Sequence, residues 1–214
     1  MIHMNTTDIN DALEKLGFTK DSLVETIFVT RNRDGSFNAT PIGVIRHGES
    51  LEVRLYKSSN TYRNLLNTTK VSINITDDSM LFLLTAFKVE LSGTPTVTDW
   101  ILEGSDATII AEKTEVSDFS ELQALFTLKP ITFIVNREMP TVFSRGRAEA
   151  IEAIIHATRV KVYQHEQDEA KVLELVEKMR ESFKIINRVS SPASSEGKVV
   201  EKLVSLLEKW GVKQ

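Results

Sequence analysis

The hydrophobic pattern of the chain changes its period once, near residue 143, and this change limits the possible folds. Before it, short runs rich in Val, Ile, Thr and Phe alternate with turn residues, as in sandwiches and barrels. After it, apolar residues recur every three or four positions, as in amphipathic helices. The sequence therefore predicts a β domain over residues 1–143 and a helical C-terminal subdomain over residues 144–214. The expected strands are residues 24–30, 36–45, 51–56, 70–76, 94–98, 107–116 and 130–136.

Two short turns connect the first three expected strands. Asp34 and Gly35 form a hairpin signal because glycine accepts a positive φ at no steric cost. Residues 46–50 contain a glycine in the same way, so the three strands are expected to form an antiparallel meander. A short helix over residues 9–17 is expected to precede them, capped by Asp8 or Asn10 and ended by Gly17.

Three helices are expected in the C-terminal subdomain. In the first, Ile151, Ile155 and Thr158 fall on one face, and the third is expected to start at Ser194 or Ser195 and end at Gly211. The apolar positions of the second and third helices are Val172, Leu175, Val176, Met179, Phe183 and Ile186, and Val199, Leu203, Leu206, Leu207 and Trp210.

A polar stripe in the first of these helices has two interpretations. It consists of Glu149, Glu152, His156 and Arg159. It could be a solvated face in which Glu152 and His156 pair across one turn. Alternatively it packs against the barrel and closes a ligand pocket, with His156 or Arg145 near an anionic substrate.

Composition excludes several classes of function. With 214 residues and a net charge of -4, the chain offers little electrostatic attraction for nucleic acid. It has no cysteine, and its four histidines lack short ligand spacing, so neither a disulfide nor a metal site is expected. Asp77 and Asp78 could be a metal pair, but a helix cap is the simpler interpretation. No apolar run approaches the roughly 20 residues of a membrane span, and no signal peptide is visible, so a cytoplasmic protein is expected.

Polar side chains alternate with apolar ones in two expected strands. In residues 51–56, Arg54 and Tyr56 point away from the core, and in residues 71–76 Asn74 and Thr76 do the same. If these strands are neighbours, the four side chains share a polar groove. Near Pro41 and Gly43 we expect a sheet edge or bulge, because proline cannot donate to a strand ladder.

Residues 57–65 follow a strand and read as the start of a short helix. Ser59 or Asn60 can cap it, and its unpaired N–H groups, with Lys57, Ser58, Ser59 and Thr61, have the parts of a phosphate-binding site. The alternative is an ordinary helix cap beside a solvated lysine. Tyr56 and Tyr62 could stack on a ligand or only fill the wall, whereas Trp100 and Trp210 read as packing residues.

Four blocks of sequence together resemble a known family. They are residues 25–44, 51–65, 71–78 and 143–159. Their order and spacing are similar to an uncharacterised, mainly archaeal family of the FMN-binding split-barrel superfamily, which includes flavin reductases and pyridoxamine phosphate oxidases. The resemblance implies a six-stranded antiparallel split β-barrel that forms a homodimer, with FMN at the subunit interface. It implies ring contacts from Asn38, Thr40, Pro41, Ile42 and Gly43, and phosphate and ribityl contacts from Arg54, Tyr56, Lys57, Ser58, Ser59 and Thr61, with Asn74 and Thr76 alongside.

The resemblance favours an FMN-dependent oxidoreductase, in which the flavin supplies the redox chemistry and the chain positions it. No G-x-G-x-x-G follows a strand, yet related reductases bind NAD(P)H against the flavin without that motif. One alternative is an FMN-binding carrier or sensor without turnover. Another is a barrel that binds no ligand and only dimerises.

Overall fold

The structure is a computed structural model that describes residues 6–18, 20, 23–91, 93, 95–136 and 144–212. The chain divides into two compact units, residues 1–76 with 95–140, and residues 77–94 with 141–214. We call the first the barrel unit and the second the helical unit. The expected boundary after residue 143 falls beside residues 137–143, which lie outside the described ranges.

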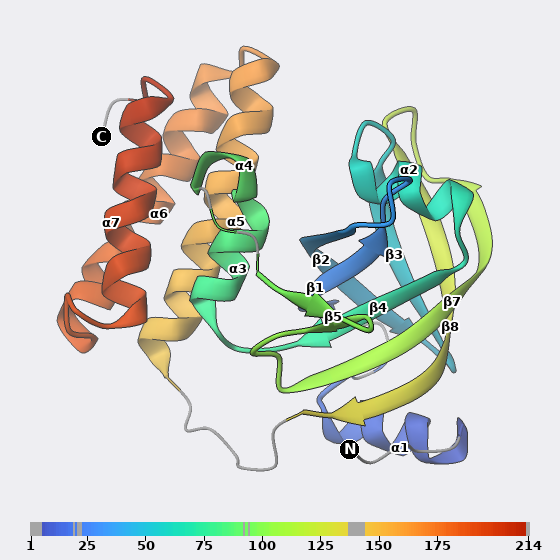
Figure 1. The fold of residues 1–214 in the computed structure, drawn as a ribbon. Coiled ribbons are helices and arrows are strands. Elements are labelled where there is room, and N and C mark those ends of the chain that lie inside the picture. The colour runs from blue at the N-terminus through green and yellow to red at the C-terminus, as the bar shows by residue number, and fades with distance from the viewer. Residues whose placement is uncertain are drawn as a thin grey trace. The chain divides into compact units, whose positions relative to one another are not determined.

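The barrel unit is a closed, six-stranded antiparallel barrel in which the strand order is β1-β2-β3-β8-β7-β4 (Figure 1). This confirms the expected fold class, and β1 to β3 form the expected meander. A separate two-stranded sheet pairs β5 with β6. The strands are β1 (Leu23–Arg31), β2 (Phe37–His47), β3 (Ser50–Tyr56), β4 (Lys70–Ile75), β5 (Val97–Thr98), β6 (Ile101–Leu102), β7 (Ala107–Asp118) and β8 (Gln123–Val135).

Two strands depart most from their expected bounds, while the other expected strands differ by one or two residues at an end. Of the expected strand over residues 94–98, residue 94 lies outside the described ranges, and among residues 95–98 only Val97 and Thr98 form a strand, β5. In the other direction, β8 begins at Gln123, seven residues before the expected start at Pro130. Pro130 lies at a register irregularity opposite Ala111, which is where a strand tolerates a residue without an N–H group. The proline therefore marks a local break within a long strand and not its beginning.

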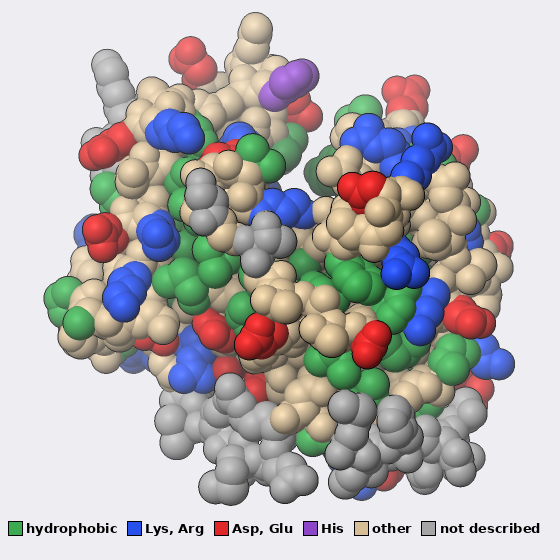
Figure 2. Space-filling view, in the orientation of Figure 1, with side chains coloured by type: hydrophobic (Ala, Val, Ile, Leu, Met, Phe, Trp, Pro, Cys, Tyr) green, Lys and Arg blue, Asp and Glu red, His purple; other side chains and the backbone are tan. Residues whose placement is uncertain are grey.

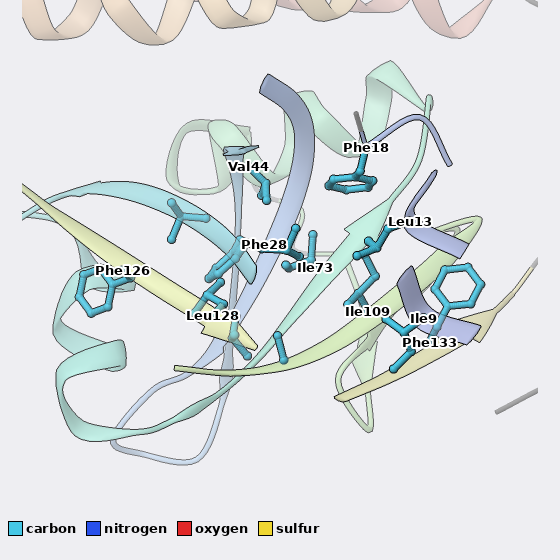
Figure 3. Packing of buried hydrophobic residues seen from close by; sticks show 14 of the residues in the cluster. Ile9, Leu13, Phe18, Phe28, Val44, Ile73, Ile109, Phe126, Leu128 and Phe133 are labelled. Carbon is cyan, nitrogen blue, oxygen red and sulfur yellow. The ribbon is translucent and has the colours of Figure 1, made fainter. Parts of the chain in front are cut away.

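The interior of the barrel follows from the alternation of side chains along each strand. Leu51, Val53 and Leu55 of β3 are buried, as expected from a period of two. Helix α1 (Thr6–Lys15) adds Ile9 and Leu13 to the same core, beside Phe133 of β8 (Figure 3). This helix starts at Thr6, earlier than the expected caps, and ends before Gly17, whose φ is 91°.

The helical unit consists of α3 (Ser79–Ala86), α4 (Lys88–Leu91), α5 (Arg145–His165), α6 (Glu169–Val189) and α7 (Ser195–Lys209). Ser194 caps α7 and Gly211 follows it with a φ of 69°, as expected. Residues 79–86 form α3, which packs with α5 and α7. Asp78 caps it by accepting the Met80 N–H at 2.8 Å, so the cap interpretation is confirmed for Asp78.

The face of α5 that carries Ile151, Ile155 and Thr158 is not its most buried face. Ile151 and Ile155 are only partly buried, whereas Ala153, Ile154 and Val160 are fully covered. The polar stripe is solvated only in part: Glu152 and Arg159 are exposed, whereas His156 is 8% exposed and Glu149 accepts a hydrogen bond from Ser182 of α6. Part of the stripe therefore faces α6. The residues of α5 beside it are small alanines, so the spacing of large apolar residues in the sequence did not indicate that this face is buried. The expected pairing of Glu152 with His156 is present, at 3.4 Å.

The distribution of charged side chains on the surface fits the nearly balanced numbers of acidic and basic residues in the sequence. Lys, Arg, Asp and Glu are interspersed over the visible face of each unit (Figure 2). Within the described residues, no helix combines the length and apolar character that crossing a bilayer requires.

Candidate functional site

The sheet is open between β2 and β3 at one end of the barrel. These strands pair only from Val44 to His47 and from Ser50 to Val53. Before Val44, β2 pairs with β1 alone, and after Val53, β3 pairs with β8 alone. We call this opening the β2–β3 split, bounded by residues 38–43 of β2 and 54–56 of β3. Pro41 and Gly43 thus lie on a strand edge, as expected.

Helix α2 (Asn60–Asn67) lies at the same end of the barrel and contacts β1, β2 and β3. It is held by side-chain amides. Asn38 of β2 donates to the Thr61 hydroxyl at 3.1 Å, and both residues are buried. Asn64 donates to Thr30 at 3.0 Å and to Asn32 at 2.8 Å, which ties the helix to the β1–β2 hairpin. The start of α2 is therefore fixed beside the β2–β3 split.

The first turn of α2 has one side-chain cap. The Ser59 hydroxyl accepts the Tyr62 N–H at 3.1 Å, which confirms the cap interpretation for this residue. The Ser59 carbonyl accepts the Arg63 N–H at 3.3 Å. Neither bond uses the N–H groups of Asn60 and Thr61, which belong to the first turn of the helix. A helix start of this kind carries partial positive charge and favours an anion.

The two cations of the expected site have partners within the chain. The Arg54 guanidinium lies 4.1 Å from the centre of the Phe119 ring. The Lys57 ammonium lies 2.6 Å from an Asp118 carboxylate oxygen. Both partners come from the hairpin between β7 and β8. Sequence reasoning missed both of them, because they are distant in the chain and no motif marks them.

Alternation along β2 divides the expected ring contacts between two sides. Ile42 packs against the barrel core, and its carbonyl accepts a hydrogen bond from Thr26 at 2.9 Å. Gly43 has the opposite parity, and a Cβ added to it would lie 2.9 Å from the Leu23 side chain. Side chains at Asn38, Thr40 and Ile42 therefore cannot face the same partner as Pro41 and Gly43, although the main chain of all five can.

Asn74 and Thr76 lie elsewhere. The expectation that their strand neighbours β3 is wrong, because β4 pairs with β1 and β7, across the barrel from β3. Asn74 is also buried: its amide oxygen accepts from the Leu102 N–H and the Thr108 hydroxyl, and its NH2 donates to Ile27. The β5–β6 hairpin covers this outer face, which the sequence pattern had shown as wet.

The remaining expected residues can be placed briefly. Ser58 is exposed and Tyr56 is 47% exposed at the end of β3, while Tyr62 packs edge-on against Phe126 in the core. Trp100 and Trp210 pack against Phe37 and Phe87, as expected. Around the β2–β3 split the structure thus brings together Asn38, Thr40, Pro41, Ile42, Gly43, Arg54, Tyr56, Lys57, Ser58, Ser59 and Thr61. As ligand contacts these residues stay predictions. Nowhere in the described parts of the chain do three potential metal ligands cluster.

Solved structures of similar fold include a protein of Methanosarcina mazei described as FMN-bound. It matches with a TM-score of 0.71 and 25% identity, over 90% of this chain and 98% of its own. Two lower matches are a flavin reductase of styrene monooxygenase from Pseudomonas putida and a putative flavin reductase from Shewanella frigidimarina. Their TM-scores are 0.48 and 0.47, their identities 12% and 15%, and they cover 55% and 62% of this chain and 82% and 75% of their own.

A family model matches residues 24–137, which include all six barrel strands except the first residue of β1. The match covers more than half of the chain, and the Methanosarcina mazei protein carries the same family description. The resemblance found in the sequence is thereby confirmed. The chain belongs to the family described as protein of unknown function DUF447, of which this region is the N-terminal domain.

Proposed function

We propose that the protein binds FMN at the β2–β3 split. The observation that carries this proposal is the likeness, over 90% of the chain, to a family member described as FMN-bound. The phosphate is assigned to the start of α2, where the Asn60 and Thr61 N–H groups are outside the cap bonds and Lys57 lies three residues before Asn60. The ring is assigned to the unpaired edge of β2 at Pro41 to Gly43.

The described residues fit these assignments in two respects. Pro41 and Gly43 lie where β2 has no partner on the β3 side, so main chain is available there to a planar ring, and Leu23 covers the Cβ side of Gly43. The hydrogen bond from Asn38 to Thr61 fixes the helix start relative to that edge, so the two ends of the ligand site are held at a constant separation. A site for a rigid ring with a charged tail needs such a fixed separation.

We further propose that the protein is an oxidoreductase that works as a homodimer. Bound FMN can accept and return a hydride, and the chain's own residues then hold the ring and exclude water from it. The exposed side chains of Tyr56, Phe119 and Leu122 beside the site support a second copy as the neighbour of this surface. Electron transfer from NADH or NADPH is tested by anaerobic mixing with the flavin-loaded protein. An unchanged visible flavin spectrum with both donors would favour a carrier or sensor.

FMN binding is tested by titrating the purified protein and following the quenching of flavin fluorescence. Lys57→Ala should weaken binding by about 10-fold or more, because charge-assisted bonds to phosphate are among the stronger contacts. Thr61→Ala should weaken it as well, with thermal unfolding checked because Thr61 is buried. Lys129→Ala, an exposed lysine of β8 that lines a pocket with Ile9 of α1, is the matched control. Equal affinity in Lys57→Ala and Lys129→Ala would place the phosphate elsewhere.

A further inference from the structure

The ion pair between Lys57 and Asp118 has a consequence for the proposed FMN site, on which this inference rests. The Lys57 ammonium and the Asp118 carboxylate are 2.6 Å apart. The Lys57 side chain is 31% exposed and that of Asp118 is 83% exposed, so solvent and ligands can reach the pair from the carboxylate side. A single ammonium at the start of α2 is thus already matched with one negative charge.

Asp118 is held in this position by its hairpin. Strand β4 pairs with β7 only up to Glu112, and beyond it β7 continues, paired with β8 alone, to Asp118. We call residues 113–123 the β7–β8 arm. The turn at its tip is closed by hydrogen bonds from the Phe119 and Ser120 N–H groups to the Gln123 carbonyl, at 3.1 and 2.9 Å.

Two further contacts fasten the tip of the arm to the end of β3. The Lys57 N–H donates to the Leu122 carbonyl at 2.9 Å, and the ring of Phe119 lies against the Arg54 guanidinium. Consecutive residues of the arm, Asp118 and Phe119, therefore contact both cations that the resemblance implies for the phosphate and ribityl chain. The backbone contacts of the hairpin therefore hold Asp118 next to Lys57.

A phosphate monoester carries a charge of about −1.5 to −2 at neutral pH, so it competes directly with a carboxylate for one ammonium. An exposed ion pair is weak enough to exchange one anion for another. We propose that Asp118 is a specificity-determining residue: its carboxylate occupies Lys57 in the free protein, competes with the flavin phosphate and lowers the affinity for FMN. The same carboxylate leaves the affinity for riboflavin, which lacks the phosphate, unchanged.

The test compares FMN with riboflavin in the full-length protein, by fluorescence titration. Asp118→Asn should tighten FMN binding by about 2- to 5-fold, the range that the loss of one exposed competing charge allows. Riboflavin binding should not change. Glu115→Gln is the matched control, because it removes the same charge from an exposed position of the same arm, and it should change FMN binding by clearly less. In a Lys57→Met background the effect of Asp118→Asn should shrink towards that of Glu115→Gln.

Weaker or unchanged FMN binding by Asp118→Asn, relative to Glu115→Gln, would overturn the inference while the proposed function stands. An equal gain for FMN and riboflavin would overturn it as well, because the effect would not involve the phosphate. Absence of FMN binding by the unmodified protein and every variant would instead remove the proposed function and this inference together. Thermal unfolding of each variant checks that the substitution leaves the protein folded. We expect no loss of stability in Asp118→Asn, because the Asp118 side chain is exposed.

Discussion

His156 is the residue whose environment departs most from its expected one. Its side chain is buried against α6, its Nδ1 has no hydrogen-bond partner, and its Nε2 lies 3.4 Å from Glu152. Burial lowers the pKa of this imidazole from its ordinary value of 6.5. The charges of Arg159 and Lys178 lower that pKa further, while Glu152 and Glu174 partly oppose them. The folded protein therefore prefers the neutral imidazole.

This preference predicts an acid-sensitive stability. Since the pKa in the folded state lies below that in the unfolded state, the unfolded chain binds more protons as the pH falls through 6.5. The free energy of unfolding should thus fall from pH 7.5 to pH values below about 6. In His156→Leu this fall should be smaller, as measured by urea unfolding at a series of pH values. His165→Gln, an exposed histidine of the same helix, is the control, and an identical pH dependence in both variants would contradict the interpretation.

At the scale of elements, the sequence predicted what local patterns determine. Alternation gave β3 and its buried residues, and Ser194 with Gly211 gave the limits of α7. The sequence-based predictions were wrong where contacts between distant segments determine the bounds of a strand or the buried face of a helix. Pro130 was read as the start of a strand, since only the pairing of β8 with β7 shows that the ladder accommodates it. In α5 much of the buried face consists of the small residues Ala150, Ala153 and Ala157, and a pattern of large apolar residues cannot detect that.

Arg147 of α5 joins three segments of the helical unit. Its guanidinium pairs with Asp77, just before the Asp78 cap of α3, and lies 3.7 Å from Glu196 of α7. The Arg147 and Glu196 side chains are 25% and 12% exposed, so the pair is partly shielded from water. Removing a shielded charge leaves its partners without compensation. The segment of residues 77–94 is thereby tied to helices that follow much later in the chain.

Arg147→Met should therefore lower the free energy of unfolding by about 1 to 3 kcal/mol, the range for leaving a buried polar partner without its hydrogen bond. The measurement is chemical unfolding followed by far-UV circular dichroism. Arg180→Met is the matched control, because Arg180 pairs with Glu177 on the exposed face of α6, and we expect it to change stability by at most about 0.5 kcal/mol. Similar losses in the two variants would show that the Arg147 contacts contribute no more than a surface pair.

At the scale of the whole molecule, strand order was the least predictable property. The polar faces of β3 and β4 look alike in sequence, yet the closed barrel places them on opposite sides, so Asn74 does not join Arg54. Pairing between distant strands is decided by closure of the sheet and not by local alternation. The grouping of the residues around the β2–β3 split was predictable because they lie on two consecutive strands and the helix that follows them. The partners from the β7–β8 arm required the fold.

The proposed homodimer gives the last prediction. Tyr56, Phe119 and Leu122 meet around the tip of the arm, because Tyr56 pairs with Gln123 and the Lys57 N–H with Leu122. Their side chains are 47%, 47% and 64% exposed. A single exposed apolar residue is ordinary, but three from one small region form a cluster that calls for an explanation. Stable dimer interfaces bury about 800 Å² per partner and concentrate aromatic residues at their centre. A second copy seated here would cover these side chains beside the proposed flavin site.

Leu122→Glu should consequently shift the protein from dimer to monomer at micromolar concentration, because a buried carboxylate without a partner is costly. Leu173→Glu provides the control: Leu173 is 67% exposed on α6 of the helical unit, so the substitution is chemically the same and equally exposed in the monomer. Light scattering after size-exclusion chromatography measures the mass of each variant. Dissociation by Leu173→Glu alone would move the interface to the helical unit, and a monomeric unmodified protein would rule out the dimer. If Leu122→Glu also weakens FMN binding while Leu173→Glu does not, the partner subunit contributes to the flavin site.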